Sequence, residues 1–379
     1  MRLTFFVAQV VAHCPTVRQM ITTLNEPTSP FRIVDVTTST TEQIAQALRE
    51  SDGILIEATI LGASRNPHLF PHYLQLAHSL NGSHLIEVVR LLLEPDVPRL
   101  LVAADFDLHG PLGGGMTPEQ AERFDGLAWD YVELPPGVEG VPGRLEEGWM
   151  HEGTSAIANW QNIRDDFPCQ IEFPHAVSGT DIAGRQARAM WDTCIPGQPY
   201  VTRKLAASSA REAALSVAPF ATTARAFFKL TRPLGVVGLS GDRVRYRFQA
   251  MNQRFTVAHS RVCWVDGSAY GYFVRKFIEV PALATPMVTP RMPMLARLGF
   301  RTGITHIETD PENFGNEASA LRNSPQLAQT MGRAAREVVE RRHLWSHRLA
   351  DLHTAARSVV AGDRRSWRYE EGALQPCSD

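Results

Sequence analysis

Short apolar runs alternate with helical patterns along most of this chain, and the alternation limits the folds that the sequence can adopt. The first runs lie at 3–11, 31–36 and 54–60, with helical patterns between them at 16–24 and 41–50. Strands that are apolar on both faces are typical of parallel sheets covered by helices on both sides. We therefore expect an α/β protein with parallel sheets.

A chain of 379 residues is too long for one ordinary core, so two domains are expected. The pattern predicts domains at 1–178 and 179–360, with a tail at 361–379 that packs back or is disordered. Further strands are expected at 99–104, 131–134, 193–196, 262–265, 286–289 and 306–308, and further helices at 68–80, 201–217, 273–283, 317–342 and 346–360.

The composition is that of a soluble globular protein, with 44% hydrophobic and 21% charged residues and a net charge of −2. No global excess of charge indicates nucleic acid or an anionic membrane as a partner. The five cysteines form no CxxC pair and no Cys/His cluster. This pattern predicts reduced thiols and no zinc site, as in a cytoplasmic protein.

The first residues, Met1 to Val7, form a short apolar run followed by Gln9 and His13. We interpret this run as a first strand rather than a signal peptide. No stretch approaches the roughly 20 apolar residues that span a bilayer. A cytoplasmic protein without a membrane span is therefore expected.

The segment from Lys276 to Val288 combines an apolar helix, one lysine, one glutamate and a turn of small residues. Lys276 and Glu279 are three positions apart, which places them on one helix face. A carboxylate can accept hydrogen bonds from ribose hydroxyls, and an ammonium can meet a diphosphate. The segment therefore suits a nucleotide-sugar site, although a solvated lysine and glutamate on a surface helix is the alternative.

The run Glu-Val-Pro-Ala-Leu-Ala-Thr-Pro-Met-Val, which starts at Glu279, resembles the Glu-Ala-x-Ala-x-Gly-x-Pro-Val segment of GT-B glycosyltransferases. The closest resemblance is to the spore-coat-type family and to the C-terminal domain of glycosyltransferase family 1-like proteins. The Asp266-Gly-Ser turn, the Leu298-Gly-Phe element and the helix after His343 fit the same family. The resemblance covers about 190–355, and the first 170 residues match only in fold pattern.

This resemblance implies two Rossmann-like domains facing across a cleft, with the acceptor on the N-terminal one and the nucleotide sugar on the C-terminal one. It implies that Glu279 binds the ribose and that Arg275 and Lys276 lie near the diphosphate. The family also places a Gly-x-x-Tyr-x-x-Arg element before a helix, which corresponds here to Gly197, Tyr200 and Arg203. Backbone N–H groups at such a turn can bind an anion, and an ordinary basic first turn is the alternative.

One position departs from the family pattern. Many retaining members carry a glutamate eight residues before the ribose glutamate, and this chain has Gly271 there. The retaining or inverting outcome is therefore left open. The flanking Tyr270 and Tyr272 are candidates for the sugar pocket, with plain aromatic packing as the alternative.

An inverting transferase needs a general base for the acceptor hydroxyl. Asp107 and His109 follow the expected strand at 99–104 and share a face if that segment is extended, so either can be the base. A turn with a capping aspartate and a solvated histidine is the alternative. His13 and His151 are weaker candidates for the acceptor pocket.

Together these residues predict a metal-independent enzyme that moves a hexosyl or related glycosyl group from a UDP or other nucleotide-diphosphate sugar to a hydroxyl acceptor. No cofactor is expected beyond that substrate, and no metal ligand is assigned. A sugar-nucleotide epimerase of the same fold, a transferase acting on nucleic acid and a non-catalytic binding protein are the alternatives. The sugar, the acceptor and the oligomeric state stay open.

Overall fold

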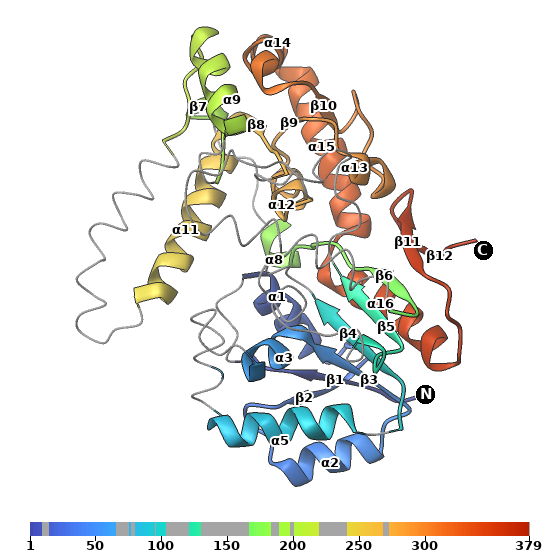
Figure 1. Cartoon of the computed structure of the whole chain (residues 1–379). Helices are drawn as coiled ribbons and strands as arrows, with labels where there is room; N and C mark the ends of the chain where they lie inside the picture. The colour runs from blue at the N-terminus through green and yellow to red at the C-terminus, as the bar shows by residue number, and fades with distance from the viewer. Residues whose placement is uncertain are drawn as a thin grey trace. The chain divides into compact units, whose positions relative to one another are not determined.

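The computed structural model describes residues 1–9, 15–65, 76, 80–94, 96–103, 121–129, 167–182, 189–197, 201–219, 241–267 and 273–378. They form two compact units (Figure 1). The first unit comprises Met1–His175, Trp345–Tyr369 and Leu374–Asp379, and the second comprises Ala176–Leu344 and Glu370–Ala373. Each unit contains a sheet of parallel strands, so the prediction of an α/β fold with parallel sheets is confirmed.

The sheet of the first unit runs in the order β12-β11-β6-β5-β4-β3-β1-β2. The chain starts at β1 near one side of the sheet, adds β2 outside it and then returns across β3 to β6, with every printed pairing parallel. The strands are β1 (Leu3–Val7), β2 (Arg32–Asp35), β3 (Gly53–Glu57), β4 (Arg99–Ala103), β5 (Gly126–Trp129), β6 (Gln170–Glu172), β11 (Trp367–Glu370) and β12 (Ala373–Pro376).

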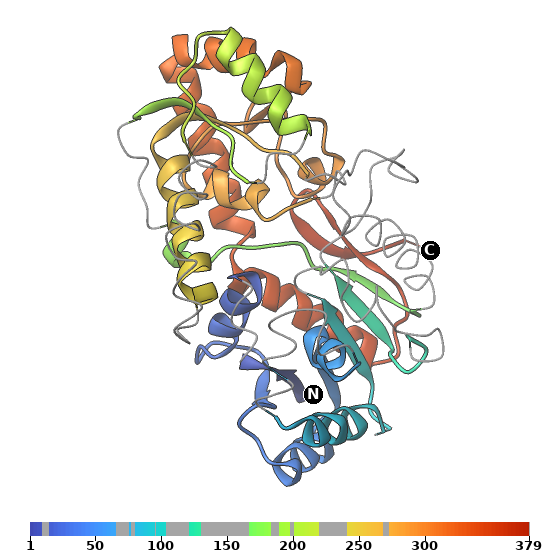
Figure 2. The ribbon, with the colours of Figure 1, turned by 60° about the vertical axis from the view of Figure 1, so that its left-hand side comes forward.

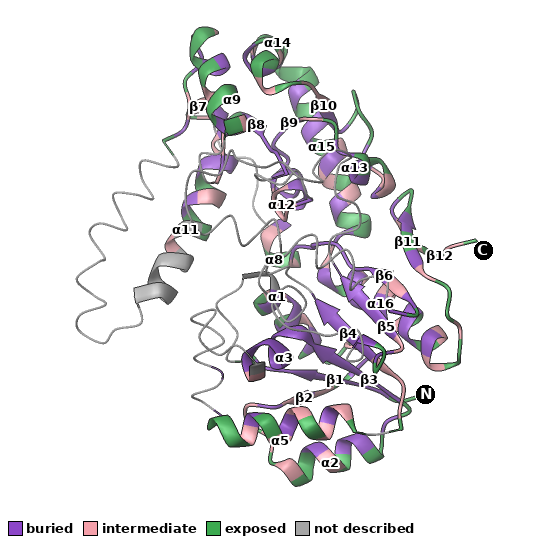
Figure 3. Ribbon diagram, viewed as in Figure 1, coloured by how far each residue is buried: buried purple, intermediate pink, exposed green. Residues whose placement is uncertain are grey.

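Amphipathic helices cover this sheet, and their order follows local sequence signals. Helix α2 (Thr41–Arg49) begins after Thr40, whose hydroxyl accepts from the Gln43 backbone while the Gln43 side chain accepts from Thr40 N. This capping box satisfies two N–H groups that the first turn would leave unpaired. Figure 3 shows the result: the strands are buried, whereas α2 and α5 turn exposed faces outward. The remaining helices are α1 (Pro15–Leu24), α3 (Ala58–Arg65) and α5 (Gly82–Leu93).

The C-terminal segment belongs to the first unit, which corrects the expected boundary at residue 360. Helix α16 (Trp345–Val360) packs beside α1 (Figures 1 and 2). Its buried Arg348 donates from Nε to the Pro174 carbonyl at 3.0 Å and lies 4.3 Å from the centre of the Tyr369 ring. The tail, expected to pack back or be disordered, forms β11 and pairs in parallel with β6. The amphipathic pattern of α16 defined a helix but not the sheet that its buried face covers.

The sheet of the second unit has the sequential order β10-β9-β8-β7. Its strands are β7 (Trp191–Cys194), β8 (Ser260–Trp264), β9 (Met287–Thr289) and β10 (His306–Glu308), and adjacent strands are parallel. The helical segments are α8 (Gly179–Ile182), α9 (Val201–Glu212), α11 (Gly241–Ala258), α12 (Lys276–Ala282), α13 (Pro293–Arg297), η3 (Pro311–Asn313), α14 (Phe314–Asn323) and α15 (Pro325–Arg342).

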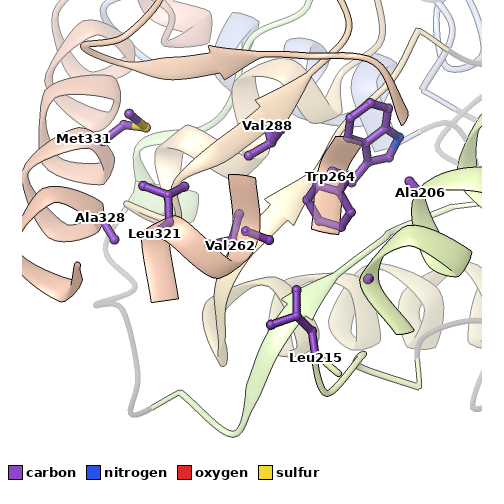
Figure 4. Close-up of a cluster of buried hydrophobic side chains, with 11 residues drawn as sticks. Ala206, Leu215, Val262, Trp264, Val288, Leu321, Ala328 and Met331 are labelled. Carbon is purple, nitrogen blue, oxygen red and sulfur yellow. The ribbon is translucent and has the colours of Figure 1, made fainter. Parts of the chain in front are cut away.

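One face of this second sheet packs against α9, α14 and α15 through a cluster of buried apolar side chains (Figure 4). Trp264 on β8 lies 5.3 Å from Phe314 on α14, measured between ring centres. Helices α9 and α14 approach closely because Gly315 has no side chain: a Cβ there would lie 2.7 Å from the Ser209 backbone carbon. The cluster comprises Ala206, Ala210, Leu215, Val262, Trp264, Val288, Phe314, Ala318, Leu321, Ala328 and Met331.

Several elements differ from the sequence expectation. The strand expected at 131–134 lies outside the described residues, whereas Gly126–Trp129 forms β5. The single helix expected at 317–342 is two helices, because Pro325 starts α15 at its first turn. Helices α5 and α11 were not expected at all. None of the helices in the described ranges combines the length and apolar character that a membrane span requires.

Candidate functional site

The carboxyl edge of the second sheet brings together side chains from three separate segments. Strands β7 and β8 are neighbours, and Cys194 at the end of β7 is in register with Cys263 near the end of β8. The loops that follow both strands therefore leave the sheet at the same edge, where open α/β sheets bind ligands. Gly197 follows β7, and Asp266 follows β8.

Arg203, in the first turn of α9, forms a buried ion pair with Asp266. Arg203 Nε donates to Asp266 Oδ1 at 2.7 Å, and Nη2 lies 2.5 Å from the same oxygen. The other oxygen, Oδ2, accepts from Thr202 Oγ1 at 2.7 Å and from Trp264 Nε1 at 3.3 Å. The two charged side chains are only 4% and 2% exposed. Such burial is tolerated because the carboxylate is paired and hydrogen-bonded on both oxygens.

Gly197 lies directly against this pair and against Lys276. A Cβ at Gly197 would lie 2.9 Å from Lys276 Nζ and 3.0 Å from Arg203 Cζ, and it would also contact Arg203 Nη1. The φ angle of Gly197 is +112°, a conformation that residues with side chains rarely adopt. The glycine thus lets the backbone of the β7–α9 turn approach two cationic groups.

Lys276 is the first residue of α12 and is half-buried. Burial, and after it the positive charge of Arg203, lowers the pKa of its ammonium to about 8. Glu279 and Asp266 act in the opposite direction but do not restore the usual value. Among the described residues, none forms a hydrogen bond or ion pair with Lys276 Nζ. A lysine held beside an arginine at a sheet edge is the arrangement expected of an anion site.

Glu279, one turn further along α12, is held from two sides. Its Oε1 accepts from Arg275 Nε at 2.6 Å and forms an ion pair with Arg275 Nη2. Its Oε2 accepts from Gln253 Nε2 of α11, also at 2.6 Å. The Glu279 side chain remains 20% exposed. Arg275 therefore pairs with Glu279, whereas the lysine next to it contacts the Gly197 turn.

The structure brings together four of the six residues expected at the donor site. They are Gly197, Arg203 and Lys276 around one turn, with Glu279 on the same helix as Lys276. Seven other expected residues lie outside the described part of the chain: His13, Asp107, His109, His151, Tyr200, Tyr270 and Tyr272. Their assignments stay predictions.

Sequence reasoning gave no role to Thr202, Gln253 or Asp266. Asp266 had a usable signal, because it is the first acidic residue after an apolar strand. Gln253 had none, because its contact with Glu279 joins two helices 26 positions apart. On the first unit, Glu57 ends β3 as a buried carboxylate whose Oε1 accepts from Thr59 N at 3.1 Å and from Thr59 Oγ1 at 2.5 Å. These bonds stabilise the turn into α3.

The sequence of the second unit matches a known family over part of its length. Residues 240–354 match a family described as glycosyl transferase-like. The matched segment begins at α11 and includes Gln253, Asp266, Lys276 and Glu279, while Gly197 and Arg203 precede it. The predicted resemblance to glycosyltransferases is confirmed over this segment, and with it the glycosyltransferase class at the level of the family match.

Solved structures with related folds are all distant in sequence. HepE from Anabaena, solved with UDP and glucose, is 9% identical over 94% of this chain and 100% of its own, with a TM-score of 0.43. Sucrose-phosphate synthase from Thermosynechococcus elongatus is 11% identical over 96% and 100%, with a TM-score of 0.45. A glycosyltransferase from Rickettsia africae is 8% identical over 96% and 99%, with a TM-score of 0.44. No curated protein matches the chain significantly.

Proposed function

We propose that this protein transfers a glycosyl group from a nucleotide-diphosphate sugar, bound by its second unit, to a hydroxyl acceptor. The observation that carries the proposal is the convergence of Lys276 and Arg203 on the Gly197 turn. Two cations and the backbone of a helix-initiating turn lie together, in a unit whose segment 240–354 is glycosyl transferase-like. A diphosphate is the ligand that this chemistry suits best.

In the proposed reaction the bond between the sugar C1 and the diphosphate oxygen breaks, and a bond between C1 and the acceptor oxygen forms. The nucleoside diphosphate leaves with the bonding electrons and gains negative charge. Lys276 and Arg203 stabilise that charge as it develops, which accelerates the step if they interact more strongly with the leaving group than with the donor. These cations are the basis for proposing a metal-independent reaction without a further cofactor.

The acceptor hydroxyl loses its proton in the same reaction. We keep Asp107 and His109 as the alternative bases, His13 and His151 as acceptor-side residues, and Tyr200, Tyr270 and Tyr272 around the donor. On the donor side, Glu279 is assigned to the ribose, because its exposed carboxylate lies one turn from Lys276 on the same short helix. A cytoplasmic location is proposed as well, in keeping with the free thiols of Cys169, Cys194, Cys263 and Cys377.

Nucleotide binding by matched lysine variants tests the donor site. UDP, GDP, ADP and CDP are titrated by calorimetry into the wild type, Lys276→Met and Lys204→Met. Lys204 is exposed in the first turn of α9 and serves as the control. We expect one nucleotide to bind, Lys276→Met to weaken it at least about tenfold, since a charge-assisted bond contributes roughly 1.5–3 kcal/mol, and Lys204→Met to change little. Equal affinity in both variants would contradict the proposed site.

Product analysis tests the reaction class. A transferase releases nucleoside diphosphate from its donor at a rate that depends on an added hydroxyl acceptor. An epimerised sugar nucleotide, formed without an acceptor, would contradict transfer. Release that is unaffected by every acceptor tested, in a protein that does bind the donor, would also count against it.

A further inference from the structure

The carboxylate of Glu279 has few acceptor positions left for a ligand. Two carboxylate oxygens offer about four lone-pair sites. Both Nε and Nη2 of Arg275 point at Oε1, and Gln253 Nε2 donates to Oε2. One site, on Oε2, therefore remains. A ribose presents two neighbouring hydroxyls, so Glu279 alone does not satisfy both of them.

Gln253 supplies the second acceptor next to that site. Its Nε2 lies 2.6 Å from Glu279 Oε2, so the carbonyl oxygen of the same amide group lies beside the remaining Glu279 site. No bond between this carbonyl and another described side chain is present. Gln253 is also only half-buried, which leaves the amide within reach of a ligand.

Gln253 is held in place by a well-anchored helix. The next residue, Arg254, donates from Nη1 to Asp181 Oδ1 and from Nη2 to the Thr180 carbonyl, both at 3.0 Å. These bonds attach α11 to the segment around α8. A binding group on a fixed helix loses little conformational freedom when the ligand arrives.

We propose that Gln253 and Glu279 together bind the two hydroxyls of the ribose, one through the Gln253 carbonyl and one through Glu279 Oε2, with Arg275 orienting the carboxylate. Gln253 is then a specificity-determining residue that selects ribonucleotides over deoxyribonucleotides. This inference rests on the proposed function, because it takes Glu279 as the ribose carboxylate. It assigns a ligand contact to a helix that the sequence pattern did not indicate.

The test measures discrimination between hydroxyls rather than affinity alone. The nucleoside diphosphate that binds the wild type is compared with its 2′-deoxy and 3′-deoxy forms by calorimetry. The same ratios are measured for Gln253→Met, Glu279→Ala and the control Met251→Ala. Methionine keeps the length of glutamine but removes both amide groups, and Met251 is an exposed residue of the same helix.

We expect the wild type and Met251→Ala to prefer the ribonucleotide about tenfold or more over each deoxy form, because a buried acceptor would lose its hydroxyl partner. Gln253→Met should lose most of the preference at one hydroxyl, and Glu279→Ala at the other. Gln253→Met that retains both preferences, or that weakens all three nucleotides equally, would overturn the role of Gln253. Circular dichroism and a thermal melt of Gln253→Met verify that the variant is folded.

The outcomes separate this inference from the proposed function. If the wild type discriminates and Glu279→Ala loses that discrimination while Gln253→Met does not, only the Gln253 assignment fails. If the wild type binds no nucleoside diphosphate, or if Glu279→Ala discriminates as the wild type does, the ribose site itself fails and the inference fails with it.

Discussion

Arg203 Nε donates a 2.7 Å hydrogen bond to Asp266 Oδ1, and both side chains are almost completely buried at the carboxyl edge of the second sheet. Asp266 thereby holds the guanidinium in one orientation beside the Gly197 turn. Thr202 and Trp264 occupy the other carboxylate oxygen, so the aspartate is itself fixed. The cationic site is thus preorganised before any ligand arrives, which is the condition under which electrostatic stabilisation costs least.

Loss of the Asp266 charge should be strongly destabilising. Asp266→Asn leaves a buried guanidinium without its counter-charge, and breaking such a pair typically costs about 3–5 kcal/mol. Urea unfolding followed by circular dichroism measures this loss. The control is Glu337→Gln, which removes an exposed partner 3.9 Å from Arg341 and should cost less than about 1 kcal/mol. Similar costs for the two variants would contradict a structural role for the buried pair.

Nucleotide affinity should fall as the pH rises through about 8. The pKa of Lys276 in the free protein is about 8, and a bound diphosphate raises it because the anion favours the charged ammonium. Binding then takes up a proton between the free and bound pKa values, so affinity decreases with pH in that window by at most about tenfold per unit for one proton.

Calorimetry between pH 6.5 and 9.5, in buffers of different ionisation enthalpy, measures both the affinity and the proton uptake. Lys276→Arg should bind with little pH dependence in this range, because an arginine stays protonated. A wild-type affinity that is flat across pH 8, or one that falls equally in Lys276→Arg, would show that another group titrates.

Substitution of Gly197 should damage binding more than backbone strain alone explains. A Cβ at this position meets Arg203 and Lys276, and φ is +112°. Gly303 offers a matched control, because its φ is +77° but nothing lies within 4 Å of the added Cβ. We expect Gly303→Ala to lose about 1–2 kcal/mol of stability, the usual cost of a left-handed conformation, with nucleotide affinity unchanged.

Gly197→Ala should lose at least that stability and also nucleotide affinity, as measured by chemical unfolding and calorimetry. The variant forces Arg203 or Lys276 to move from the turn that the diphosphate would contact. Unchanged affinity in a folded Gly197→Ala protein would show that the ligand does not lie against this turn.

Local patterns predicted much of the fold. Continuous apolar strands gave β1, β3, β4 and β8 close to their observed positions, because burial on both faces leaves a clear signal in the sequence. The helix after Thr40 and the strand before the Gly197 turn were expected for the same reason. Helix α11 was missed, because its many polar residues obscure the helical period.

The candidate site was predicted in its residue types but not in its pairings. Arg275 and Lys276 were both expected near a diphosphate, whereas the structure turns Arg275 toward Glu279 and Lys276 toward Gly197. Adjacent residues on a helix point about 100° apart, and only the surrounding elements decide which neighbour meets which partner. The partners Gln253 and Asp266 come from other elements, so spacing along the chain carries no record of them.

The sequence by itself determined the α/β class, the parallel strands and the segment 276–288 that resembles a nucleotide-sugar site, because these depend on local periodicity and residue type. The tertiary structure decided that α16 and β11 join the first unit, and that Arg203, Asp266 and Lys276 meet around Gly197. These contacts join residues far apart in the chain. They depend on strand order and on the space left by a glycine, which no local pattern encodes.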